Sequence, residues 1–117
     1  MTHSLRGSIK FIDEYRRCHF IPEWTPDEHK AFVEIVEGTA PVPRNDQLKA
    51  KIPIYTKGET TVVRVNLSKY DKPYMKRYES LIGVQLTINV EIMPYEHEQF
   101  GNGVSIKLAK YSKRITQ

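Results

Sequence analysis

The feature that most constrains the fold is a strict alternation of apolar and polar side chains over residues 84–92. The segment runs Val84-Gln85-Leu86-Thr87-Ile88-Asn89-Val90-Glu91-Ile92. A period of two sustained over this length predicts a β-strand with one buried face. Such a strand needs neighbours on its edges, so we expect the chain to build a sheet around an apolar interior.

The residues after this strand predict a long connection to a second one. Residues 93–103 contain one proline and two glycines, which interrupt regular strands. Alternation resumes over 104–108, where Lys107 falls on the polar side. We therefore expect a hairpin whose strands are joined by a long loop over 94–103.

Two further alternating segments precede the first strand. One covers 61–67, with Arg64 on its polar side, and the other covers 48–55. Pro53 cannot donate a hydrogen bond to a neighbouring strand, so the segment 48–55 is expected at an edge or at a bulge. A hairpin turn is predicted between them at 56–59, because its glycine can adopt a positive φ.

The N-terminal part of the chain is less regular. A strand is expected over Ile9–Phe20, with Ile9 and Phe11 on the same face. Residues 25–28 form a capping-box sequence that favours a helix over His29–Glu37, whereas alternation and β-branched residues in the same segment favour a strand. Both structures are compatible with that segment, and residues 40–46 are expected to form a loop.

Between residues 67 and 84 the apolar period changes from that of a strand to that of a helix. One helical face would carry Met75, Tyr78, Leu81 and Ile82. Asp71 suits the start of this helix and Gly83 its end. We expect a short helix over about 73–82, with Tyr78 in the core.

The order of these elements indicates the architecture. Five strands with one short helix between the third and the fourth is the order of an OB-fold, a five-stranded barrel that binds oligonucleotides. A chain of 117 residues is long enough for one such domain. We therefore expect a mainly β, OB-fold-like domain over 1–117, in which residues 1–47 are the least determined part and can add an N-terminal helix.

Composition excludes several classes of protein. No apolar run approaches the roughly 20 residues that span a bilayer, and Cys18 alone cannot form an internal disulfide. We therefore expect no membrane association and a cytoplasmic location. The four histidines and Cys18 lack the spacing of a metal site, and no catalytic motif is present. Neither an enzyme nor a metal or other cofactor is expected.

The charge distribution favours a nucleic acid as the partner. The formal net charge is +4, and residues 49–77 carry eight Lys and Arg against two acids. Binding of single strands requires a cationic groove and aromatic faces on which bases stack. Aromatic and basic residues lie close together in the sequence at Tyr55 and Lys57 and again at Lys110 and Tyr111. Tyr95, in the predicted loop, is a further aromatic candidate.

Three short segments resemble the filamentous-phage gene V family of single-stranded DNA-binding proteins. They are Val62–Leu67, Ile82–Ile88 and Gln99-Phe100-Gly101, the last followed by the strand that carries Lys107. The similarity covers about residues 60–114. It implies that Arg64 and Lys107 contact phosphates. It also implies that Phe100, from a loop beside a dimer axis, stacks on a base or packs near a neighbouring strand. The working unit implied by the resemblance is a two-fold dimer.

The function predicted from the sequence is therefore sequence-nonspecific coating of single-stranded DNA during phage or plasmid replication or recombination. The protein would act as a homodimer or a higher homo-oligomer. The candidate contacts are Arg64, Lys107, Phe100, Tyr55, Lys57, Tyr95 and Lys110. An RNA-binding OB module and a small viral assembly protein are the alternatives, because cations and aromatic rings do not distinguish ribose from deoxyribose.

Overall fold

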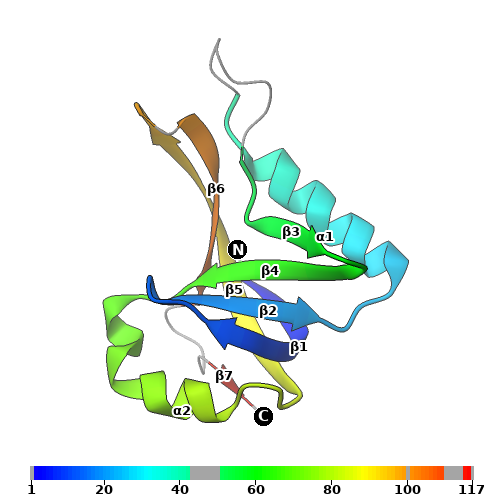
Figure 1. The fold of residues 1–117 in the computed structure, drawn as a ribbon. Coiled ribbons are helices and arrows are strands. Elements are labelled where there is room, and N and C mark those ends of the chain that lie inside the picture. The colour runs from blue at the N-terminus through cyan, green and yellow to red at the C-terminus, as the bar shows by residue number, and fades with distance from the viewer. Residues whose placement is uncertain (1, 43–50, 100, 110–114, 117) are drawn as a thin grey trace.

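The computed structural model describes residues 2–42, 51–99, 101–109 and 115–116 (Figure 1). The elements follow the order β1 (Thr2–Ile12), β2 (Arg17–Pro22), α1 (Pro26–Thr39), β3 (Ile54–Lys57), β4 (Thr60–Asn66), η1 (Lys69–Tyr74), α2 (Met75–Ser80), β5 (Leu86–His97), β6 (Gly101–Leu108) and β7 (Ile115–Thr116). Here η1 is a 3-10 helix.

Five of the strands close into a barrel. They run in the order β1-β2-β4-β6-β5, and β1 pairs with β5 to complete the ring. Every pair in the ring is antiparallel except β4 with β6. The short helices η1 and α2 connect the third barrel strand, β4, to the fourth, β5. This is the OB-like barrel with a short helix that the sequence predicts.

The prediction of a single strand over Ile9–Phe20 is wrong, because that segment contains a hairpin turn. The Asp13 carboxylate accepts hydrogen bonds from the backbone N–H groups of Tyr15 and Arg17, at 2.9 and 3.0 Å. Arg16 completes the turn with a φ of 59°. Side-chain hydrogen bonds can build such a turn without glycine or proline, and this turn contains neither. The hairpin makes β2 the second barrel strand.

A bulge in β1 changes which side chains face the core. The register of β1 against β2 shifts between Ile9 and Phe11. Ile9 is buried in the core, whereas Phe11 is 40% exposed. Placing both residues on one face, as strict alternation does, is therefore wrong. One extra residue in a strand moves every following side chain to the other face.

The segment 51–57 fills a seam where β4 and β6 separate, instead of forming the second barrel strand. β4 and β6 pair only at Asn66 and Lys107. Beyond that point Lys51 exchanges hydrogen bonds with β6, donating to Asn102 at 3.0 Å and accepting from Val104 at 2.9 Å. β3 then pairs with β4, and the hairpin turn between them contains Gly58 at a φ of 64°, as predicted. Residues 48–50 lie outside the described part of the chain.

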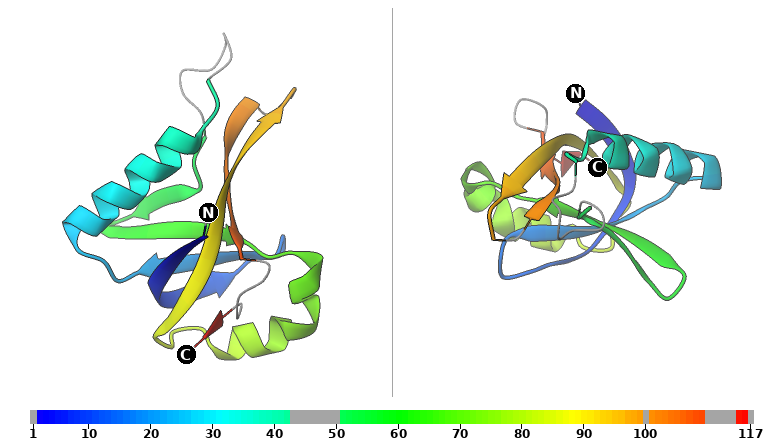
Figure 2. Two further views of the ribbon diagram at one scale, coloured as in Figure 1. Left: turned by 180° about the vertical axis from the view of Figure 1, so that it is seen from behind. Right: turned by 90° about the horizontal axis from the view of Figure 1, so that it is seen from above.

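The hairpin of β5 and β6 is longer than predicted and rises beyond the barrel (Figures 1 and 2). Strand pairing continues through Pro94, which lies opposite Val104, up to His97 opposite Gly101. The N–H of Val104 points to Lys51 and away from β5, so the ladder requires no N–H from Pro94. This explains why a proline did not end the strand.

The helices also differ in part from the prediction. The segment left open between helix and strand is α1, whose capping box joins Thr25 and Glu28. Phe32 and Val36 of α1 are buried in the core. The helix expected over 73–82 begins earlier, as η1, and Asp71 is the third residue of η1, where it forms a capping box with Ser68. Tyr78 is buried as predicted, and its hydroxyl donates to Asp71 at 2.9 Å.

Gly7 is required where β1 and β2 approach each other. A Cβ atom at Gly7 would overlap the carbonyl oxygen of Ile21 and lie 2.8 Å from Cα of Pro22. We expect Gly7→Ala to lower the free energy of unfolding by about 3 kcal/mol, because backbone atoms cannot move aside as side chains do. Urea denaturation measures this value. In the control variant Gly38→Ala the added methyl meets nothing within 4 Å, so stability should be unchanged or slightly increased.

Candidate nucleic-acid interface

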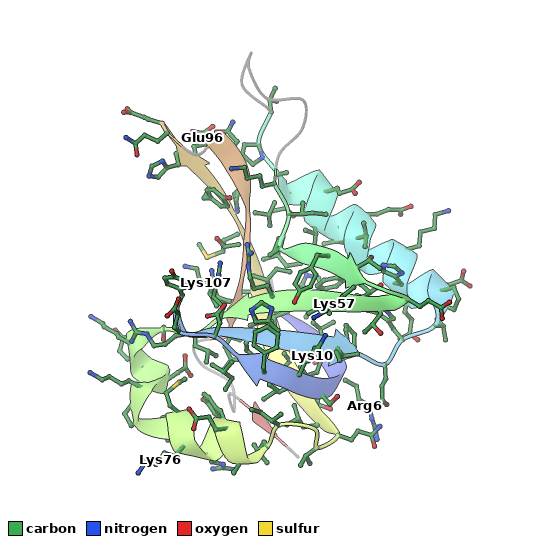
Figure 3. All side chains as sticks on the ribbon, viewed as in Figure 1. Arg6, Lys10, Lys57, Lys76, Glu96 and Lys107 are labelled. Atoms are coloured by element: carbon green, nitrogen blue, oxygen red, sulfur yellow. The ribbon has the colours of Figure 1, made fainter. Side chains whose placement is uncertain are left out.

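Four predicted contact residues lie on one outer face of the barrel. In the strand registers Lys57 is opposite Thr60, and Tyr55 is opposite Val62. Alternation places these two β4 residues on the same face as Arg64 and as Asn66, whose partner is Lys107. Lys57, Arg64 and Lys107 therefore follow β4 from one end to the other, a distance of about 20 Å. Figure 3 shows Lys57 and Lys107 toward the two ends of this strand.

An aromatic cluster occupies the middle of this face. The rings of Phe11 and His19 stack with centroids 4.0 Å apart and planes 12° from parallel. His19 lies opposite Arg64 in the register of β2 with β4, and the hydroxyl oxygen of Tyr55 is 2.7 Å from Nδ1 of His19. His19 is only 8% exposed, whereas Phe11 above it is 40% exposed. The exposed ring of Phe11 is thus an aromatic platform that is supported by the buried His19 imidazole.

Asp13 fixes the orientation of the imidazole. Its Oδ2 lies 2.9 Å from Nε2 of His19 and 2.8 Å from Nε of Arg17. Partial burial alone would raise the pKa of Asp13, but the hydrogen bonds from His19, Arg17 and Tyr15 outweigh it and lower the pKa to about 2. The ionised carboxylate faces Nε2 and can accept a hydrogen bond from Nε2–H, which leaves Nδ1 to face the Tyr55 hydroxyl.

Sequence reasoning found the cations of this face and missed its aromatic centre. Phe11 was placed on the same face as Ile9, because the bulge in β1 leaves no signal in the alternation. Tyr55 was predicted as a contact, but its hydroxyl is engaged by His19. The sequence did contain one signal. Phe11 precedes and His19 follows Asp13, a residue that can form a turn without glycine, and a turn there would bring the two rings onto neighbouring strands.

Of the remaining predicted contacts, Tyr95 belongs to the described part of the chain and does not join this cluster. Tyr95 lies on the projecting hairpin opposite Gly103, four residues and about 13 Å along β6 from Lys107. A Cβ atom at Gly103 would lie 2.6 Å from Cζ of Tyr95, so the tyrosine ring covers the glycine. Phe100 and Lys110 lie outside the described residues.

The groups that suggested metal or thiol chemistry are not arranged for it. Within residues 2–42, 51–99, 101–109 and 115–116, no three His, Cys, Asp or Glu side chains are placed to share a metal ion. Burial, together with the charge of Asp13, raises the pKa of the Cys18 thiol to about 12. The thiol is therefore protonated at neutral pH and unreactive. In the same residues, no helix has the length and apolar character needed to cross a bilayer.

Comparison with known proteins adds no further assignment. No family model, no curated protein and no solved structure matches the chain. The geometry of the outer face is therefore the basis for a functional conclusion.

The low pKa of Asp13 gives a pH-dependent contribution to stability. The folded-state pKa is about 2 and the ordinary value is 3.8, so the contribution is complete above about pH 5 and is lost progressively as the pH falls through 2. We expect Asp13→Asn to lower the free energy of unfolding by about 1–2 kcal/mol at pH 7, allowing for solvent screening. Urea denaturation at pH 7 and pH 2 measures this difference. An equal difference at both pH values would contradict the assignment.

Proposed function

We propose that the protein binds single-stranded DNA without sequence specificity, along the outer face of β1, β2 and β4. The observation that carries this proposal is the supported and exposed ring of Phe11, with a line of cations beside it on the same face. A base stacks on an aromatic ring whatever its identity, so such a platform binds strands of any sequence. The barrel topology is compatible with this use, because OB-folds bind oligonucleotides on the corresponding face.

The charges of this face are suited to phosphates. Among the described residues, Lys57, Arg64 and Lys107 make no ion pair with a carboxylate, although each lies in a folded strand. Lys10, in β1, also lies on the side of the barrel that faces the viewer in Figure 3. A phosphate that approaches this face does not have to displace an internal carboxylate. Cations held in this way release counterions when they bind a strand, which favours binding at low salt.

The resemblance to the gene V family supports the same proposal at two positions. Arg64 and Lys107 match its phosphate-contacting positions, and both lie on the outer face. The proposed role is stoichiometric coating of single strands in the cytoplasm during phage or plasmid replication or recombination. The homodimer or higher homo-oligomer implied by that resemblance is part of the proposal.

The platform is tested by removing its exposed ring. We expect Phe11→Ala to weaken binding of oligo-dT by about 1–3 kcal/mol, because one stacked base loses its partner. A fluorescence anisotropy titration measures the dissociation constant. The control is Tyr74→Ala, which removes a ring that is 48% exposed but belongs to η1, and it should leave the affinity unchanged. Equal affinities of the wild type and Phe11→Ala would contradict the platform.

The phosphate contacts are tested by the salt dependence. We expect Arg64→Ala and Lys107→Ala each to weaken binding and to reduce the slope of log K against log salt by about 0.7, the value for one contact on single strands. Lys30→Ala, which removes an exposed cation from α1, should change neither quantity. A flat salt dependence in the wild type would overturn the proposal. Competition with oligo-U in the same assay distinguishes a preference for DNA from a preference for RNA.

A further inference from the structure

A hollow lies where the line of cations reaches the parallel pair of β4 and β6. Its volume is about 380 Å³, at the lower end of the range of roughly 300–1,000 Å³ that small-ligand pockets occupy. The walls include Asn66 of β4, Glu91 of β5, Lys107 of β6 and Tyr70 of η1. Leu67 and Leu108, which belong to the core, contribute to its lining. The hollow has the size for one nucleotide.

The strand registers fix three of these side chains next to one another. Asn66 pairs with Lys107 across the parallel ladder, and Lys107 pairs with Glu91 across the antiparallel one. Neighbouring strands are about 4.8 Å apart, so an amide, an ammonium and a carboxylate occupy adjacent positions in one row. Within the described residues, the side chains of Glu91 and Lys107 form no ion pair within 4.0 Å, despite their opposite charges.

The hollow continues the proposed binding face. Asn66 is the next outward residue after Arg64 on β4, and it pairs with Arg17 of β2 on its other side. The Tyr70 ring is 55% exposed, and Nζ of Lys69 lies 5.6 Å from its centroid. A nucleic-acid strand that lies along β4 therefore reaches a position with one aromatic ring, Tyr70, and one carboxylate, Glu91. The cations at this position are Lys107 and Lys69.

The carboxylate decides which base this position favours. An ionised carboxylate only accepts hydrogen bonds, and guanine presents two adjacent donors, N1–H and N2–H. Thymine presents a single N–H between two carbonyl oxygens, which repel a carboxylate. We propose that the hollow binds one nucleotide of the bound strand and selects guanine, with Glu91 on the base edge and Lys107 on the phosphate. This inference rests on the proposed binding of single strands.

The test compares oligonucleotides that differ at one base. Fluorescence anisotropy gives the affinities for (dT)12 and for the same strand with one central dG or one central dA. We expect the dG strand to bind about ten times more tightly than (dT)12. The dA strand should gain little, although a purine stacks at least as well as thymine. Equal affinities for the dG and dA strands would assign the gain to stacking and would overturn selection by Glu91.

Variants separate recognition of guanine from general binding. Glu91→Gln keeps the size of the side chain but replaces one acceptor by a donor. The amide no longer repels the thymine carbonyls, so (dT)12 should bind more tightly and the preference for dG should fall to about twofold or less. Tyr70→Ala should weaken binding of the dG strand more than binding of the dA strand or of (dT)12. The control Lys76→Ala, which removes a cation from α2, should leave the preference at its wild-type value. A preference that survives Glu91→Gln would overturn the inference, and thermal melting verifies that each variant is folded.

Failure of this inference is distinguishable from failure of the proposed function. Binding of (dT)12 with no preference for dG leaves the coating function intact and removes the guanine site. If (dT)12 does not bind, the proposed function fails, and a titration with dGMP followed by NMR then examines the hollow alone. Shifts of the backbone amides of Asn66, Glu91 and Lys107 by dGMP and not by dTMP would support the site. Equal shifts, or none, would overturn it.

Discussion

The shape of the outer face depends on one buried imidazole. His19 is held between the Asp13 carboxylate and the Tyr55 hydroxyl, and Phe11 stacks on its ring. These contacts join the turn between β1 and β2 to β3, an element outside the barrel ring. A buried polar group is costly unless its hydrogen bonds are made, and here both ring nitrogens have partners. The network therefore fixes the position of β3 and the exposure of Phe11 together.

The sequence predicted those parts of the fold that depend on side-chain periodicity. Alternation found the barrel strands around Val63, Ile88 and Ile106. The segment after Thr25 stayed open between helix and strand, because its capping box and its alternation favoured different structures. The alternation could not locate the bulge after Ile9, because one inserted residue leaves the average composition of the strand unchanged. The continuation of β5 through Pro94 was also hidden, since it depends on where the N–H of Val104 points.

The candidate site was predictable to a similar extent. Arg64 and Lys107 stand on the polar sides of alternating strands, so their exposure followed from the pattern. Their alignment along β4 required the pairing of strands that are far apart in the sequence. Glu91 was not predicted as a site residue, because a single acid in an alternating strand is typical of an ordinary solvent-facing position. Only the three-strand register, which joins β5 to β6 and β6 to β4, places it beside Lys107 and Asn66.

The two ends of the face differ in what they can distinguish. Around Phe11 the surface offers a ring and cations, and a nucleic acid presents a π-face and a phosphate at every position. Under the proposed function, this part would therefore accept any sequence. The hollow at Asn66 adds the carboxylate of Glu91, which attracts hydrogen-bond donors of a base and repels its acceptors. A coating protein gains from the first property, because it must bind every stretch of a strand. The second property would set the register, since a guanine in the hollow fixes where neighbouring bases meet Phe11. In this way one face can combine general affinity with a preferred phase along the strand.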